Sequence, residues 1–167
     1  IVIGAEGDAA AVALAHDAAW QRFRTILDEL VAELPLLRER VGDACALEGP
    51  IARRMWTACR PFRASFITPM AAVAGAVAQE LIVHYERAGV KRAWINNGGD
   101  IALHLAPGES VRVGVLADLA RFDVARAHEP LPLDGAFTID AAMPVRGVAT
   151  SGWRGRSFSL GIADSVT

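Results

Sequence analysis

The stretch RAWINNGGDIALHL, residues 92–105, constrains the fold more than any other part of the sequence. Its second half alternates apolar and polar side chains, and the stretch as a whole predicts strands over residues 93–96 and 101–105. Between them, Asn97, Gly98 and Gly99 predict a turn with positive φ angles, which glycine adopts at no steric cost. A Pro-Gly turn and a further strand over residues 111–116 follow, so antiparallel hairpins are expected here.

Three helices are predicted in the first half of the chain. The first covers residues 8–40, and Pro35 is expected to end or kink it. The second covers residues 50–60 between two prolines, and the third residues 68–89, with Thr68 as N-cap and Gly89 as C-terminal stop. Three- and four-residue spacing places one set of apolar side chains of the first helix on a single face, opposite its charged residues. The members of this apolar set are Trp20, Phe23, Leu27, Leu30, Val31 and Leu34.

Helices followed by hairpins predict an α+β fold, with helices packed on a mostly antiparallel sheet in one domain over residues 1–167. Both ends read as strand interiors, so the chain is expected to be clipped at each end. A net charge of -2 gives no reason to expect a nucleic-acid partner. The longest weakly polar run, residues 67–78, is shorter than the roughly 20 residues that cross a bilayer. No membrane contact and a reducing, cytoplasmic location are therefore expected of a chain with two cysteines.

The start of the third helix is the first candidate for a binding site. Free N–H groups at a helix N-terminus suit an anion, and Thr68 and Met70 lie at this start. Small side chains follow from Ala71 to Ala78, and Gly75 is among them. A face of small residues usually indicates tight packing on a sheet, and the alternative is that it makes room for a ligand.

Asp100 is the second candidate, because it follows the turn formed by Gly98 and Gly99. An aspartate in this position can hydrogen-bond the amides of its own turn, which is a structural role. Alternatively, the turn lets a ligand approach the backbone, and the carboxylate binds a ribose hydroxyl or a cation. The residues alone slightly favour the structural role.

The third candidate is the segment GVATSGWRGRSFS, residues 147–159, which does not have the pattern of an ordinary core strand or helix. Its hydroxyl groups and flexible backbone offer hydrogen-bond donors, and its two arginines point the same way if the chain is extended. Arginine pairs bind phosphate or carboxylate in a forked geometry, but they can also pair with acidic residues or remain solvated. The candidate ligand-binding residues here are Thr150, Ser151, Gly152, Arg154, Arg156 and Ser157.

Other common sites have no support in the sequence. The four histidines lack the spacing of metal ligands, which argues against a zinc site. No GxSxG, GxGxxG or GxxxxGK[ST] motif occurs, so the corresponding hydrolase, dinucleotide and P-loop folds are disfavoured.

Three segments in order, FITPMAAVAGAVAQE, INNGGDIAL and GVATSGWRGRSFSLGIADSVT, resemble an uncharacterised family of short ApbE-like proteins. The resemblance covers essentially the whole chain, including EGPIARRM. The family is related to ApbE, the magnesium-dependent flavin transferase once called a thiamine biosynthesis lipoprotein, which moves FMN from FAD onto a threonine of a target protein. The resemblance implies an ApbE-like fold in which residues 68–75, 97–100 and 149–152 line one cleft for FAD or FMN with Mg²⁺.

The sequence also departs from the ApbE pattern. Ala74 and Gly75 stand where the ApbE helix motif has a lysine, and Gly161 stands where its HI-x-DP motif has a histidine. The metal-binding Asp and Thr of ApbE follow the point where this chain stops, so the metal ligands are unknown. Asp164 is the remaining candidate for acid–base catalysis or metal binding.

Two functions therefore remain open from the sequence. The first is an ApbE-like, Mg-dependent enzyme related to FMN transferases and acting on a flavin nucleotide. The alternative is a non-catalytic module that binds a nucleotide-like or other small anionic metabolite. A homo-oligomer is compatible with either function, and a purely structural role ranks behind both.

Overall fold

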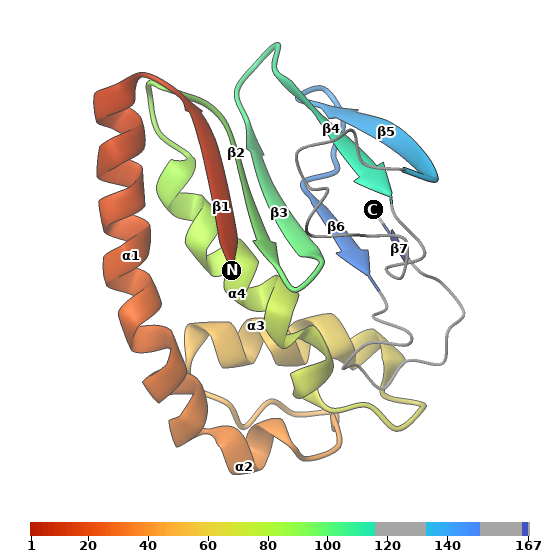
Figure 1. Ribbon diagram of the computed structural model, residues 1–167. Helices are drawn as coiled ribbons and strands as arrows, with labels where there is room; N and C mark the ends of the chain where they lie inside the picture. The colour runs from red at the N-terminus through yellow and green to blue at the C-terminus, as the bar shows by residue number, and fades with distance from the viewer. Residues whose placement is uncertain (116–132, 151–164, 167) are drawn as a thin grey trace, which may run out of the picture.

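The computed structural model describes residues 1–115, 133–150 and 165–166, which form helices packed on antiparallel sheets (Figure 1). The predicted α+β class is confirmed. The larger sheet has five strands in the order β1-β2-β3-β6-β7, and β4 and β5 form a second sheet. Every described strand pair is antiparallel. The strands are β1 (Val2–Gly7), β2 (Val90–Asn97), β3 (Asp100–Leu105), β4 (Ser110–Val115), β5 (Gly135–Asp140), β6 (Gly147–Thr150) and β7 (Ser165–Val166).

The helices are shorter than the sequence patterns predict. They are α1 (Ala9–Ala32), α2 (Leu34–Leu37), α3 (Pro50–Cys59) and α4 (Val73–Ile82), with 3₁₀ turns η1 (Arg60–Phe62), η2 (Pro69–Ala72) and η3 (Val83–Tyr85). The first predicted helix ends before Arg40, because Pro35 opens the separate short helix α2. The third is divided into η2, α4 and η3. It begins at the predicted N-cap position, Thr68, but its helical turns end at Tyr85, before the predicted stop at Gly89. Gly89 does have a positive φ of 88°, but it lies in the turn before β2.

Two apolar clusters lie on opposite faces of the larger sheet. The first joins α1, α3 and α4 to the sheet and includes the fully buried side chains of Met55, Tyr85 and Ile95. The second lies between β3 and the β4–β5 sheet and is centred on Leu103 and Ile139. The hairpin of β2 and β3, which the sequence predicts, therefore forms the middle of the molecule (Figure 1).

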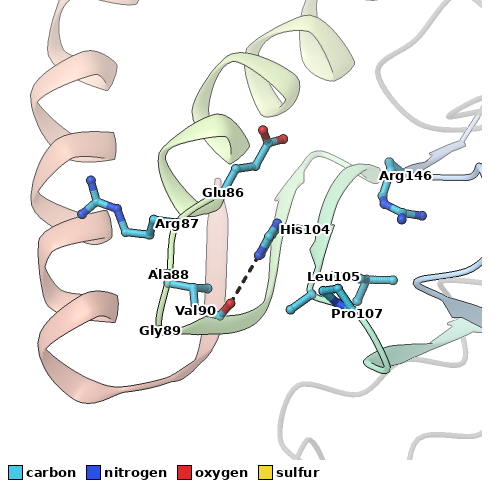
Figure 2. A pocket seen from close by; sticks show the side chains of 10 residues that line it. Glu86, Arg87, Ala88, Gly89, Val90, His104, Leu105, Pro107 and Arg146 are labelled. Carbon is cyan, nitrogen blue, oxygen red and sulfur yellow. Dashed lines mark hydrogen bonds between the residues drawn. The ribbon is translucent and has the colours of Figure 1, made fainter.

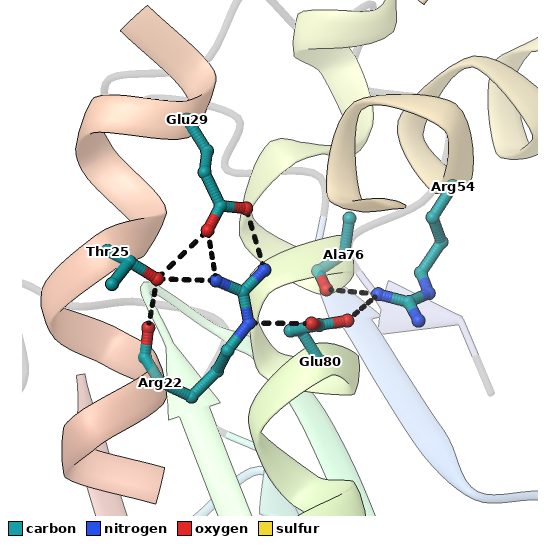
Figure 3. A network of polar contacts seen from close by, with 6 residues as sticks. All are labelled: Arg22, Thr25, Glu29, Arg54, Ala76 and Glu80. Carbon is teal, nitrogen blue, oxygen red and sulfur yellow. Dashed lines mark hydrogen bonds and ion pairs between the residues drawn. The ribbon is translucent and has the colours of Figure 1, made fainter. Parts of the chain in front are cut away.

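The face that α1 buries differs from the predicted one. Its buried side chains are Ala15, Ala19 and Ile26, whereas Trp20 is 58% and Leu27 70% exposed. The charged side of α1 contributes Arg22 to a polar network with α3 and α4 (Figure 3). The three small or β-branched residues allow α1 to approach the rest of the molecule closely, and this packing turns its large apolar side chains outward.

The glycine- and hydroxyl-rich third candidate begins with the strand β6, although its sequence does not have the pattern of an ordinary core strand. Residues Gly147 and Val148 of β6 pair with Ala102 and Ile101 of β3. A Cβ on Gly147 would lie 3.0 Å from the carbonyl oxygen of Ile101, so a small residue allows close pairing there.

No helix in the described ranges is long and apolar enough to span a membrane.

Candidate functional site

Three segments that are distant in the sequence meet at the turn between β2 and β3. The backbone N–H of Thr150, at the end of β6, donates to Asp100 Oδ1 at 3.1 Å. The backbone N–H of Gly75, in the first turn of α4, also donates to the Asp100 carboxylate. A third link runs from Asn97 Nδ2 to the carbonyl oxygen of Ala74 at 3.1 Å. Asp100 therefore joins the start of α4 to the end of β6.

The turn has the backbone conformation that the sequence predicts. Gly98 and Gly99 have φ angles of 67° and 104°, and the N–H of Gly99 donates to Asn96 Oδ1 at 2.9 Å. A Cβ on Gly99 would overlap Thr150 Oγ1, whereas a Cβ on Gly98 would have no atom within 4 Å. Gly99 is thus needed for the close approach of β6, and Gly98 leaves open space at the tip of the turn.

Asp100 carries the unusual electrostatics of this cluster. Burial raises its pKa, and the hydrogen bonds from the backbone of Thr150 and Gly75 oppose that change only in part. Among the described residues, both of its hydrogen-bond donors are backbone amides, and no cationic side chain is bonded to it. An ionised Asp100 would therefore be stabilised by a cation or by a ligand hydroxyl group.

These contacts also modify one prediction. The start of the third helix was expected to offer free N–H groups to an anion, but the carboxylate of Asp100 accepts from the Gly75 amide. Asp100 does have a structural role, but not the one that the sequence slightly favours: among the described residues its donors are amides of α4 and β6 and not those of its own turn. A carboxylate has about four acceptor positions, so two amides do not exhaust it.

The structure brings together Gly75, Asn97, Gly99, Asp100 and Thr150, and Gly98 extends from the same turn. Thr68 lies at the start of the 3₁₀ turn η2 and Met70 lies within it, and this turn precedes α4. Thr68 makes no side-chain cap, and Met70 packs against the first apolar cluster. The remaining candidates, Ser151, Gly152, Arg154, Arg156, Ser157 and Asp164, lie outside the described residues.

Asn96 belongs to the same turn but was not singled out from the sequence, where it reads as the end of a strand. Its side-chain oxygen accepts a hydrogen bond from the backbone N–H of Gly99, and this bond fixes the backbone conformation just before the two glycines. The signal that could have found it is the Asx residue three positions before a glycine of positive φ.

The described residues contain no group of three or more His, Cys, Asp or Glu side chains placed to hold a metal ion. This does not conflict with Mg²⁺, which is commonly bound by one or two carboxylates together with ligand phosphates and water. Asp100 could supply one such carboxylate, and its burial without a cationic partner among the described residues is compatible with a bound Mg²⁺ ion.

A separate hollow lies at the other end of β2 and β3 (Figure 2). It is open, has a volume of about 550 Å³, and is lined in part by Arg87, His104 and Arg146. Arg87 points towards α1 and away from Arg146, and His104 Nε2 lies 3.4 Å from the carbonyl oxygen of Val90 (Figure 2). Its charged groups do not converge, and it includes none of the residues around Asp100.

Comparison with known proteins places the chain within one family over its full length. The model of the family described as "AbpE bacteria" matches residues 1–167. Similar proteins include three UPF0280 proteins. That of Methanospirillum hungatei is 39% identical over 102 residues, which are 60% of this chain and 37% of that protein. That of Methanothermobacter thermautotrophicus is 37% identical over 121 residues, which are 72% of this chain and 42% of that protein.

The UPF0280 protein of Methanosphaerula palustris is 34% identical over 148 residues, which are 86% of this chain and 56% of that protein. The chain thus spans between about two fifths and just over half of the length of these relatives.

Proposed function

We propose, from the premise that this chain belongs to the AbpE bacteria family, that it binds a flavin nucleotide at the Asp100 cluster. The family assignment is shown by the match over residues 1–167, and the predicted relation to an ApbE-like family agrees with it. Membership of the wider ApbE superfamily, and with it a flavin ligand, is part of the proposal. FAD and FMN are the ligands that the resemblance implies.

The observation that carries this proposal is the meeting of α4, the β2–β3 turn and β6 at Asp100. These are the three segments that the ApbE resemblance assigns to one flavin cleft. Their convergence supports a common site, because the hydrogen bonds join residues 25 and 50 positions from Asp100 in the sequence. The open space beside Gly98 supports the approach of a ligand to the backbone.

The residues of this site suit the phosphate end of such a ligand. Asp100 would hold Mg²⁺ or a ligand hydroxyl group, and the ion would supply neutralisation of the phosphate oxygens. Thr150 would donate its hydroxyl group, and Gly98 would expose its backbone N–H. Arg154 and Arg156 are proposed to bind the phosphates by forked hydrogen bonds, and Asp164 to act as an acid–base or metal-binding group.

The test is flavin binding with and without Mg²⁺ by the native chain and by Asp100→Asn. We expect FAD or FMN fluorescence to be quenched on binding, and Asp100→Asn to weaken the Mg²⁺-dependent affinity roughly 10-fold or more, as expected for loss of a charged ligand group. Asp140→Asn is the matched control. Asp140 also accepts hydrogen bonds from two backbone amides, those of Ala142 and Met143, but it lies outside the cluster.

Equal flavin affinities of the native protein and Asp100→Asn in the presence of Mg²⁺ would show that Asp100 does not contribute to the binding site. Absence of binding to both flavin nucleotides, with a folded protein confirmed by circular dichroism, would contradict the proposed ligand class.

A second candidate is binding without transfer, and one feature of the sequence favours it. Ala74 and Gly75 occupy the place of the ApbE lysine, and the structure uses the backbone of both residues to hold Asn97 and Asp100. Incubation with FAD, Mg²⁺ and a threonine-containing acceptor peptide separates the two candidates. In the transfer, the threonine hydroxyl forms a phosphoester with the FMN phosphate while the pyrophosphate bond of FAD breaks and AMP leaves. A gain in peptide mass of one FMN less one water, with release of AMP, supports the transferase, whereas flavin binding without this gain supports the binding module.

A further inference from the structure

An apolar stripe runs along the outer side of α1. It consists of Trp20, Phe23, Leu27 and Val31, which follow one another at steps of three, four and four residues and are all exposed. This spacing keeps them on one side of an α-helix. The rings of Trp20 and Phe23 are stacked, with centroids 5.9 Å apart and an angle of 29° between their planes. Contiguous exposed apolar side chains of this size indicate an interaction surface.

The stripe is complementary to a second copy of itself when the two helices run antiparallel. A two-fold axis between residues 25 and 26 places Trp20 of one copy opposite Val31 of the other, and Phe23 opposite Leu27. Each of the larger rings then meets an aliphatic side chain. Such a contact is isologous, which means that the same surface serves both copies and the assembly closes as a dimer.

The charges beside the stripe are complementary in the same arrangement. Arg24 and Asp28 are both exposed and lie on the same flank of the stripe. In an antiparallel pair of helices, like flanks face each other, so Arg24 of one copy lies opposite Asp28 of the other. Within the described residues, Arg24 makes only a 3.5 Å hydrogen bond to Gln21, and no ion pair involves Asp28. Both charges are thus available for pairing between copies.

We propose that α1 forms a homodimer by antiparallel packing of this stripe against a second copy of the chain. Four large apolar side chains and their polar flanks from each copy can bury on the order of 1,000 Å², which is the size that a specific interface requires. The stripe lies on α1, whereas the Asp100 cluster is formed by α4, β3 and β6, so the two share no residue. Dimerisation and ligand binding are therefore separable.

The first test replaces Leu27 with glutamate and measures mass in solution by light scattering and sedimentation. The native chain is expected to be a dimer. Leu27→Glu places a charge in the middle of the contact and should raise the dissociation constant roughly 30-fold or more, as for a central interface residue. Leu14→Glu is the matched control, because Leu14 is another exposed leucine of α1, 61% exposed, on a different side of the helix. It should leave the dimer unchanged.

The second test reverses charges on the flank. Arg24→Asp should weaken the dimer by placing two carboxylates opposite each other, and Asp28→Arg should weaken it in the corresponding way. The double variant Arg24→Asp/Asp28→Arg should restore the native dissociation constant, which a general loss of folding could not do. A monomeric native chain would overturn the proposal, as would a dimer that is insensitive to Leu27→Glu or a double variant no tighter than the single ones.

Discussion

Replacing Glu80 with alanine is expected to lower the free energy of unfolding by about 3 kcal/mol, at the low end of the range for breaking a buried ion pair. Glu80 lies on α4 and accepts hydrogen bonds from Arg22 Nε of α1 at 2.8 Å and from Arg54 Nη1 of α3 at 2.7 Å (Figure 3). Its side chain is only 15% exposed. The alanine variant leaves two partly buried guanidinium groups without this common acceptor.

Urea denaturation followed by circular dichroism measures this effect. Arg22 retains Glu29 as a partner and Arg54 retains a 3.4 Å contact with the carbonyl oxygen of Ala76, so the fold is expected to persist. Gln79→Ala is a control on the adjacent exposed position of α4, where a change within about 0.5 kcal/mol is expected. Equal stabilities of the Glu80→Ala and Gln79→Ala variants would show that the network contributes nothing.

The same network makes stability depend on pH. Burial alone raises the pKa of Glu80, but the hydrogen bonds from Arg54 and Arg22 outweigh it, so its pKa lies below the usual value of 4.5. Because the folded protein holds the ionised form more strongly than the unfolded chain does, the contribution is complete above pH 4.5 and is lost as the pH falls through the folded pKa. The difference in stability between the native chain and Glu80→Gln should shrink over that range.

The hairpin of β2 and β3 could be predicted because its information is local. Two consecutive glycines between apolar runs specify a turn with positive φ, and both glycines have that conformation. The bounds of α3 were predictable for a similar reason, since prolines lie close to both of its ends.

The orientation of α1 could not be predicted in this way. Periodicity shows which side chains share a face of a helix, but it does not show which neighbour that face meets. Arg22 is turned inwards by Glu80, which is 58 residues away in the sequence. The large apolar side chains then lie outside, which is the arrangement on which the proposed dimer depends.

The candidate site was predictable as separate residues and not as an arrangement. Gly75, Asp100 and Thr150 each stand out by residue type, but the position of β6 beside β3 brings Thr150 to Asp100. That pairing joins Ile101 to Val148 and depends on the whole order of strands. The glycine-rich composition after Gly147 also hid a strand, because small residues weaken the usual strand pattern.

Gly99→Ala is expected to lower the free energy of unfolding by about 3 kcal/mol and to weaken flavin binding. The backbone of Gly99 has a φ of 104°, where a side chain costs about 1–2 kcal/mol. The new Cβ would also overlap Thr150 Oγ1, and overpacking of this kind costs a further 1–3 kcal/mol. Relief of the overlap moves β6 away and breaks the hydrogen bond from the Thr150 amide to Asp100. Urea denaturation and fluorescence quenching measure the two effects.

Two variants separate backbone strain from the contact with β6. Gly98 also has a positive φ, 67°, but a Cβ there would have no neighbour within 4 Å. Gly98→Ala should therefore lower the free energy of unfolding by only about 1 kcal/mol. Thr150→Ala removes the overlapping oxygen, and combined with Gly99→Ala it should recover about 1–2 kcal/mol as a favourable coupling energy. If Gly99→Ala costs no more than Gly98→Ala and shows no coupling to position 150, then the turn and β6 are not in the close contact from which the site has been built.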